Sequence, residues 1–294
     1  MGRKARPLQE QVALLQKRGM IIAEPEKARR ILLEIGWYRM SFYWFPFETR
    51  YPDRFDPTHK FRDGTRFEDA LLLYAFDFNL RNTLLKPLER IETALRTYII
   101  YAVSTRYPDR PEWFADPKVV SAAHARQFER SVYSVLRRTQ PEIELHHKRF
   151  PRDRFAPAWK TLEFMTFGAM WTLFESLNSE SLRLDVARHF GVHNLDVFCN
   201  YMEIVRALRN LCAHGNILYS FHPSKILRGP ALGGKADPPR NLYGALTIVD
   251  HFLGEISERL QLELRDDIRD HLRQFSQSPG AARLLHSIFP KRYF

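Results

Sequence analysis

The chain has 294 residues, of which 45% are hydrophobic and 13% aromatic, so we expect a folded globular protein rather than a disordered one. Forty-five Lys and Arg against 34 Asp and Glu give a formal charge of +11, which favours a polyanionic partner such as nucleic acid. No apolar run is long enough to span a bilayer and the N-terminus lacks the apolar stretch of a signal peptide, so we expect a cytoplasmic protein with no membrane partner. Cys199 and Cys212 are the only cysteines, and no spacing of Cys and His suits zinc, so we expect neither a metal nor a cofactor.

The N-terminal segment from Pro7 to Trp37 is expected to form two short helices. Apolar residues recur at helical spacing over Leu8 to Leu15, and Pro25 opens the second helix. The block from Trp37 to Phe47 then carries many aromatic side chains around Arg39. A packing wedge between helices is the simpler interpretation of this block, and stacking against RNA bases is the alternative.

A long helix is predicted from Phe67 to about Tyr107, after a loop over residues 48–66. Thr65 and Glu68 have the spacing of a capping box at its start, and Pro87 interrupts its pattern. Its apolar residues form a stripe that suits a helical bundle. The stripe consists of Leu72, Leu73, Phe76, Leu80, Leu84, Leu88, Ile91, Leu95 and Ile99.

The polar face of the same helix offers ion pairs one turn apart. Asp77 with Arg81, and Glu92 with Arg96, have the i,i+4 spacing at which opposite charges meet on a helix. Surface ion pairs are the simplest interpretation. The alternative is that a carboxylate of this face orients an active-site arginine.

Residues 118–149 are predicted to form a basic helix or helix pair after a proline-rich break. Positive charge is concentrated at its end, where Lys148, Arg149 and Arg152 are candidates for contacts with RNA phosphates. An ordinary solvated loop explains these residues equally well.

The remainder of the chain is also predicted to be helical. Gly168 is expected at a close-packing point of the first helix of this part, and residues 223–239 are expected to be irregular. Strand-like alternation is nearly absent, so the predicted fold class is all-α. The predicted helices cover residues 158–177, 185–190, 194–212, 242–264 and 267–275.

One dozen residues carry a distinctive polar pattern, from Arg206 to Ile217. At about 100° per residue, Arg206, Arg209, Asn210 and His214 share one arc of roughly 140° on a helix. Arg209 and His214 lie at opposite edges of that arc, so they would not touch on an ideal helix. Gly215 and Asn216 suit a left-handed C-cap, which predicts that the helix ends just after the histidine. The alternative interpretation is a solvated polar surface.

Several blocks in this order resemble the Abi-like family of bacterial abortive-infection proteins, of the AbiD and AbiF type. The last block also resembles the signature of the wider HEPN superfamily, in which an Arg is followed after four to six residues by a His; here four residues separate Arg209 from His214. The blocks are Gly19-Met-Ile-Ile, Trp37-Tyr-Arg-Met-Ser-Phe-Tyr-Trp-Phe-Pro-Phe47, Phe67-Glu-Asp, Tyr74-Ala-Phe-Asp77, Leu80-Arg81, Leu88-Glu-Arg-Ile-Glu-Thr-Ala-Leu-Arg-Thr97, Trp159-Lys-Thr-Leu-Glu-Phe-Met-Thr-Phe-Gly168 and Leu208-Arg-Asn-Leu-Cys-Ala-His-Gly-Asn-Ile217.

The resemblance implies a HEPN-type helical bundle with an N-terminal helical extension. We expect residues 1–64 to form the extension with its aromatic wedge, residues 65–264 the HEPN-like core, and residues 265–294 a helical tail packed on the core. It also implies a homodimer in which two such motifs face each other, an RNA substrate, and a small noncoding RNA as a candidate inhibitor, because some family members are restrained by a structured RNA.

The implied activity is that of a metal-independent endoribonuclease toxin that acts in defence against phage. His214 would serve as general acid or base, Arg209 would stabilise charge on the phosphorane, and Asn210 would hold the imidazole or a phosphate oxygen. Arg206 and Arg96 would assist RNA binding or pair with neighbouring carboxylates, and Arg39 is a further candidate for RNA contact. The competing hypothesis is a noncatalytic RNA-binding or interaction module, and a membrane-acting toxin is a distant third.

Overall fold

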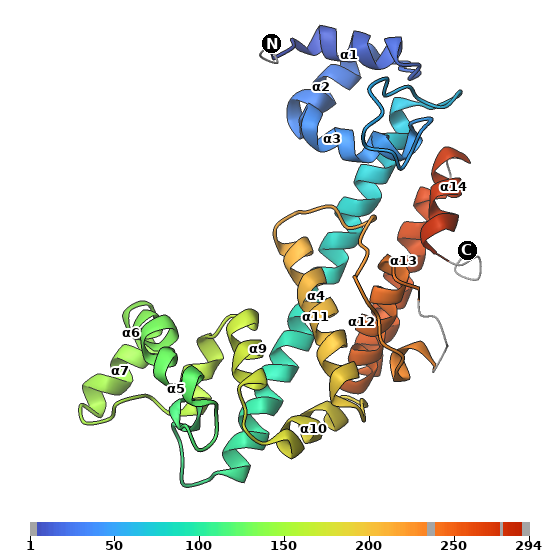
Figure 1. Ribbon diagram of the computed structural model, residues 1–294. Helices are drawn as coiled ribbons and strands as arrows, with labels where there is room; N and C mark the ends of the chain where they lie inside the picture. Colours follow the sequence, from blue (N-terminus) through green and yellow to red (C-terminus); the bar gives the residue numbers. More distant parts are fainter. Residues whose placement is uncertain (1–4, 234–238, 277–278, 290–294) are drawn as a thin grey trace.

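The long helix predicted from Phe67 is present as α4 (Phe67–Arg106), and most of the other helices pack along it (Figure 1). The computed structural model describes residues 5–233, 239–276 and 279–289. Within these residues three isolated β-bridges occur but no strand, so the all-α prediction is confirmed. The HEPN-type assignment and the three-part division of the chain stay predictions.

α4 begins at Phe67 as predicted, but the residue that caps it is not the predicted one. The N-cap is Arg66, whose backbone N–H donates to the Asp69 carboxylate at 3.0 Å. Thr65, the predicted cap, uses its hydroxyl in the preceding turn, where it donates to the Arg62 carbonyl at 2.7 Å. The predicted capping box of Thr65 and Glu68 is therefore wrong, because an aspartate one position further along holds the first turn.

The apolar stripe of α4 is the centre of the core. Leu73, Leu80, Leu84, Leu88, and Ile91 are each fully buried, and the helix continues through Pro87. Burying such a side chain contributes roughly 1.5–3 kcal/mol, so this stripe is a major source of stability. The helices that contact α4 include α3, α9, α10, α11, α12, α13 and α14.

The N-terminal part covers the first turns of α4. It consists of α1 (Leu8–Lys17), α2 (Pro25–Ile35) and α3 (Trp37–Trp44), followed by a 3-10 turn over Phe45–Phe47. Tyr43 and Trp44 are buried where α3 packs against α4. The aromatic block therefore acts as the predicted packing wedge.

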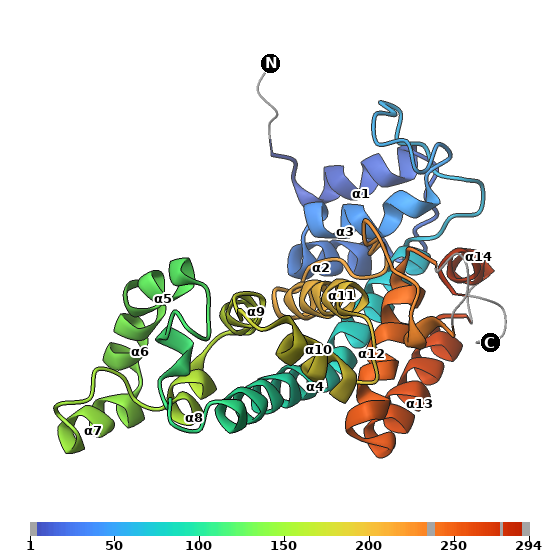
Figure 2. The same ribbon diagram turned by 60° about the horizontal axis from the view of Figure 1, so that its bottom comes forward.

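A lateral lobe extends from the far end of α4, away from the N-terminal helices (Figures 1 and 2). It contains the predicted basic helical segment as α5 (Ala122–Phe128), α6 (Ser134–Thr139) and α7 (Pro141–Arg149). A single wider helical turn, Glu129–Tyr133, joins α5 to α6.

The single helix predicted over residues 158–177 is wrong. The chain forms α8 (Ala158–Thr161), a 3-10 turn over Leu162–Phe164, and α9 (Phe167–Glu175). Met165 and Thr166 are extended, and the Thr166 hydroxyl caps α9 by accepting from the Ala169 N–H at 3.2 Å. Gly168 is not a close-packing point, because the space next to its Cα is open.

The C-terminal half supplies the helices that flank α4. These are α10 (Glu180–His189), α11 (Leu195–Ala213), α12 (Leu242–Ile256), α13 (Glu258–Phe275) and α14 (Pro279–Ile288). Between α11 and α12 the chain is irregular except for a 3-10 turn at Pro230–Leu232, as predicted, although residues 234–238 of that stretch lie outside the described residues.

The break between α12 and α13 lies at Ser257, not near residue 265 as predicted. Ser257 has φ −165° and ψ 108°, which is extended backbone. The turn lets α13 fold back so that the Gln261 side chain donates to the Asp250 carbonyl at 2.9 Å, and both helices contact α4. α12 and α13 both pack against α4, and this packing overrides the helical pattern that the sequence continues to Leu264.

The described helices include none with both the length and the apolar composition needed to cross a bilayer.

We predict that Leu88→Ala lowers the free energy of unfolding by about 2–5 kcal/mol, because it leaves a cavity where α4 meets its neighbours. Leu33→Ala, at a leucine that is 74% exposed, should change it by less than about 0.5 kcal/mol. Urea unfolding followed by circular dichroism measures both values. Equal stability of the two variants would contradict the central position of α4.

Candidate functional site

Helix α11 presents the predicted polar arc on its accessible side. Asn194 caps its start by accepting from the Val197 N–H at 3.0 Å. The side that faces the core carries Ile204, Val205, Leu208 and Cys212, all buried. On the opposite side Asn210 and His214 are exposed, and Arg206 and Arg209 are half-buried. The helical-wheel prediction of one polar face is confirmed.

The helix ends at the position predicted from its glycine. His214 is the C-cap residue, and Gly215 follows at φ +63°, a conformation that favours glycine. The Asn216 N–H donates to the Leu211 carbonyl at 2.9 Å and the Gly215 N–H to the Cys212 carbonyl at 3.2 Å, which is the Schellman arrangement. His214 is therefore an exposed residue at a helix end that is closed by these two backbone hydrogen bonds.

A carboxylate of α4 lies between two arginines of the site. Glu92 is buried, and its Oε2 lies 3.3 Å from Nε of Arg209. Its Oε1 accepts from Arg96 at 3.0 Å, and Arg96 also donates to the Met165 carbonyl at 3.0 Å. The predicted pair of Glu92 and Arg96 forms, but it is buried rather than on the surface. Glu92 thus contacts Arg209 as well as Arg96, and the alternative, in which a carboxylate of this face orients an active-site arginine, stays a prediction.

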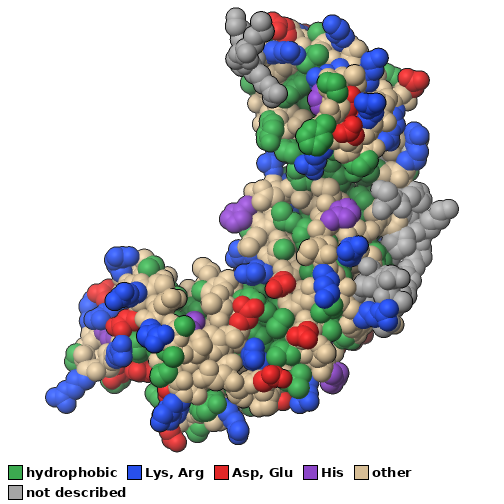
Figure 3. Space-filling model, viewed as in Figure 1, with side chains coloured by type: hydrophobic (Ala, Val, Ile, Leu, Met, Phe, Trp, Pro, Cys, Tyr) green, Lys and Arg blue, Asp and Glu red, His purple; other side chains and the backbone are tan. Residues whose placement is uncertain are grey.

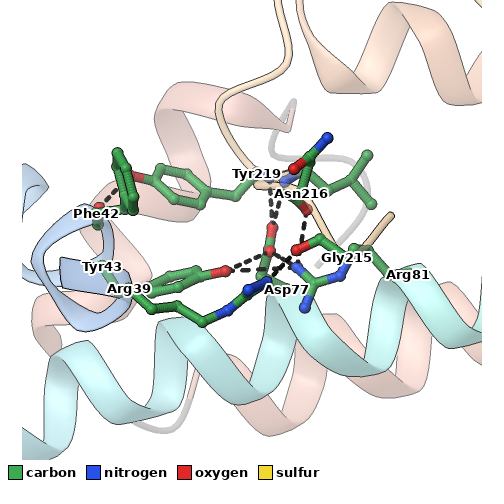
Figure 4. A network of polar contacts seen from close by, with 9 residues as sticks. Arg39, Phe42, Tyr43, Asp77, Arg81, Gly215, Asn216 and Tyr219 are labelled. Atoms are coloured by element: carbon green, nitrogen blue, oxygen red, sulfur yellow. Dashed lines mark hydrogen bonds and ion pairs between the residues drawn. The ribbon is translucent and has the colours of Figure 1, made fainter. Parts of the chain in front are cut away.

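The second predicted pair on α4 is also buried. Asp77 and Arg81 form an ion pair in the core, and the Tyr43 hydroxyl donates to Asp77 at 2.9 Å (Figure 4). The other oxygen of Asp77 accepts from the backbone N–H groups of Leu218 and Tyr219, at 2.9 and 2.6 Å. Burial raises the pKa of Asp77, and the Arg81 charge and these donors oppose the shift. The pair thereby fixes the segment that follows His214 to α4.

Arg39 and the same Arg81 hold the carbonyl groups at the end of the motif. Arg39, from α3, donates to the Gly215 carbonyl, and Arg81 donates to the Asn216 carbonyl at 3.2 Å (Figure 4). The structure thus brings Arg39 to the motif, where it binds backbone. This anchoring network was not predicted from the sequence, although the i,i+4 spacing of Asp77 and Arg81 was the signal that pointed to it.

The remaining basic candidates lie elsewhere. Lys148 and Arg149 are at the end of α7, which both views draw well apart from α11, and Arg152 follows them in the exposed turn (Figures 1 and 2). Lys148 pairs with Glu144 at 2.5 Å, and Arg149 lies over the Phe150 ring at 5.6 Å. The structure does not bring this group together with the motif within one chain.

Lys and Arg side chains are spread along the whole face shown in Figure 3, interspersed with Asp and Glu. Among the described residues no group of three or more His, Cys, Asp or Glu side chains could hold a metal ion. Burial raises the pKa of Cys199 to about 11 and that of Cys212 to about 12, so both thiols stay protonated near neutral pH.

We predict that Asp77→Asn lowers the free energy of unfolding by about 3–5 kcal/mol, because it leaves the buried charge of Arg81 without its counter-ion. Replacing Arg81 as well, in Asp77→Asn/Arg81→Met, should recover part of the loss since the buried charge is then gone. Urea unfolding measures both. If Asp77→Asn alone is as stable as the wild type, the pair does not anchor this segment.

The model of the Abi-like protein family matches residues 30–220, which is more than half of the chain. The matched segment includes α3, α4 and the whole of α11 with its end at Gly215. Comparison with curated proteins and with solved structures found no match. By its sequence, and with both the motif and its anchoring residues inside the matched region, the chain belongs to the Abi-like protein family.

Proposed function

We propose that this protein is a metal-independent endoribonuclease that acts as the toxin of an abortive-infection defence against phage. Membership of the Abi-like family supports the role in defence. The observation that carries the proposed activity is the end of α11, where exposed His214 and half-buried Arg209 occupy one accessible face above the buried Glu92.

The proposed reaction is transesterification within RNA. His214 takes the proton from a ribose 2′-hydroxyl, the 2′-oxygen attacks the adjacent phosphorus, and the bond to the 5′-oxygen breaks. The protonated His214 then returns that proton to the leaving oxygen, so the products are a 2′,3′-cyclic phosphate and a 5′-hydroxyl. Arg209 stabilises the negative charge of the phosphorane, and Asn210 holds the imidazole or a phosphate oxygen. The arginine supplies the positive charge that this step requires, so the reaction needs no divalent ion.

We further propose that two subunits build one active site. Arg209 and His214 lie at opposite edges of the polar face of α11, so one helix presents them to different parts of a cleft. An isologous dimer that pairs two such faces brings Arg209 of one subunit beside the other subunit's copy of the histidine. The exposed Ala213 between them has a small side chain, which permits the two helices to approach closely.

The basic candidates take different roles in this proposal. Arg39 and Arg96 donate to backbone carbonyls, and Arg96 also pairs with Glu92, so we assign them to positioning the motif. Arg206, Lys148, Arg149 and Arg152 are proposed to contact phosphates of a bound RNA outside the scissile bond. The same surfaces could hold a small structured RNA that restrains the toxin, in keeping with the formal charge of +11.

We predict that the purified protein, stripped of bound nucleic acid, cleaves RNA in EDTA and leaves 2′,3′-cyclic phosphate ends. His214→Ala should lower the rate by about 10²–10⁴-fold, because it removes the general acid–base group, while RNA binding persists. Cleavage of end-labelled RNAs and filter binding measure the two effects. A wild type that binds varied RNAs but cleaves none would refute catalysis and leave the noncatalytic RNA-binding module.

Glu92→Gln should lower kcat about tenfold or more with a smaller change in KM, because it removes the charge that holds Arg209 against α4. Glu89→Gln, an exposed substitution of the same type on the same helix, is the matched control and should leave both constants unchanged. Steady-state cleavage of a fluorogenic RNA measures them. If both variants behave as the wild type, Glu92 does not position Arg209.

A further inference from the structure

A cavity of about 1110 Å³ lies between the N-terminal helices and the segment that follows the motif. Its walls come from α1, from α3, from the loop after α3 and from residues 217–222. The two sides are joined by the Tyr219 hydroxyl, which donates to the Phe42 carbonyl at 2.7 Å (Figure 4). The proposed cleavage chemistry uses none of the side chains of this cavity.

Aromatic side chains make up much of the wall. They include two edge-to-face pairs: Trp37 with Trp44, whose ring centroids are 4.9 Å apart, and Phe45 with Tyr51, at 5.1 Å. Trp37, Phe45 and Tyr51 are half-buried, so their rings border both the core and the open space. Such surfaces stack with nucleobases, because every base has a flat π face.

The charged side chains of the wall favour an anion. Arg6, Arg18 and Arg54 line the cavity together with one carboxylate, Glu48. Glu48 is buried, and both of its oxygens lie 3.2 Å from Nδ1 of His59, while its charge also acts on Arg18. Arg54 lies over the Phe45 ring, 5.9 Å from its centroid. With three arginines against one carboxylate the wall keeps an excess of positive charge for a phosphate, to which arginine can donate two parallel hydrogen bonds.

We infer that this cavity binds a nucleotide, with its base against the aromatic side chains and its phosphate on Arg6, Arg18 and Arg54. Known ligand pockets measure about 300–1,000 Å³, so there is room for a nucleotide with an adjoining phosphate. The site is distinct from the proposed cleavage site, and its occupant is either a residue of a bound RNA or a free nucleotide. A sugar phosphate would use the arginines alone and leave the aromatic wall uncovered.

The test uses the full chain carrying His214→Ala and stripped of nucleic acid, so that binding is read without cleavage. The four nucleoside 5′-monophosphates, ribose 5-phosphate and a single-stranded RNA hexamer are titrated while tryptophan fluorescence is recorded, because Trp37 and Trp44 line the cavity. We expect a nucleotide or the hexamer to quench the fluorescence and ribose 5-phosphate to bind at least about tenfold more weakly. Binding of the monophosphates identifies a free nucleotide as the ligand, and binding of the hexamer alone identifies an RNA residue.

Arg6→Glu/Arg54→Glu reverses two exposed charges of the cavity and should weaken this binding about tenfold or more. Arg30→Glu/Arg126→Glu makes the same charge change at two exposed arginines outside the cavity and should keep the affinity within about twofold. The inference is overturned if no probe binds, if ribose 5-phosphate binds as tightly as the nucleotides, or if both double variants lose binding equally. A loss of cleavage activity alone would bear on the proposed function and not on this site.

Discussion

The buried ion pair of Asp77 and Arg81 joins the two parts of the protein that the site needs. Both residues belong to α4, yet the backbone groups that they bind belong to residues 216–219, which begin two residues after His214. A charge pair of this kind is costly to bury and is stable only when its remaining hydrogen bonds are made. These hydrogen bonds are made with the backbone N–H groups of Leu218 and Tyr219, the carbonyl of Asn216 and the Tyr43 hydroxyl. The end of α11 therefore has one position relative to α4.

The same helix orients the arginine of the motif. Glu92 lies fifteen residues after Asp77 on α4, and its carboxylate contacts Arg209, while His214 is exposed. Polar contacts on α4 thus hold the motif at two points, one at Arg209 and one just after His214. Such support is what the proposed reaction requires, because a displacement of about 1 Å can cost two orders of magnitude in rate. It also explains why three of the arginines that a basic composition would assign to RNA serve the protein's own backbone and carboxylates: Arg39, Arg81 and Arg96.

Periodicity predicted most of the helices, since the apolar stripe of α4 and the two-sided pattern of α11 are local features. It failed where packing overrides local preference. At Ser257 the chain turns so that α12 and α13 both contact α4, and the residue type there does not predict the end of a helix. Thr65 and Glu68 have the spacing of a capping box, but the carboxylate that holds the helix start is that of Asp69, one position after Glu68. The spacing of the polar residues predicted the polar face of α11, and Gly215 predicted its end after His214. The contacts of Asp77 with Leu218 and of Arg39 with Gly215 join residues more than 130 positions apart, and only the fold brings them together.

In the proposed active site, Arg209 and His214 act across a dimer. The most direct measurement mixes Arg209→Ala protein with His214→Ala protein under conditions in which subunits exchange, verified with two different tags. A shared site predicts that activity, absent from each variant alone, returns to about a quarter of the wild-type value, because about half of the dimers are mixed and each mixed dimer holds one intact site. A mixture that exchanges subunits and stays as inactive as its components would contradict the shared site.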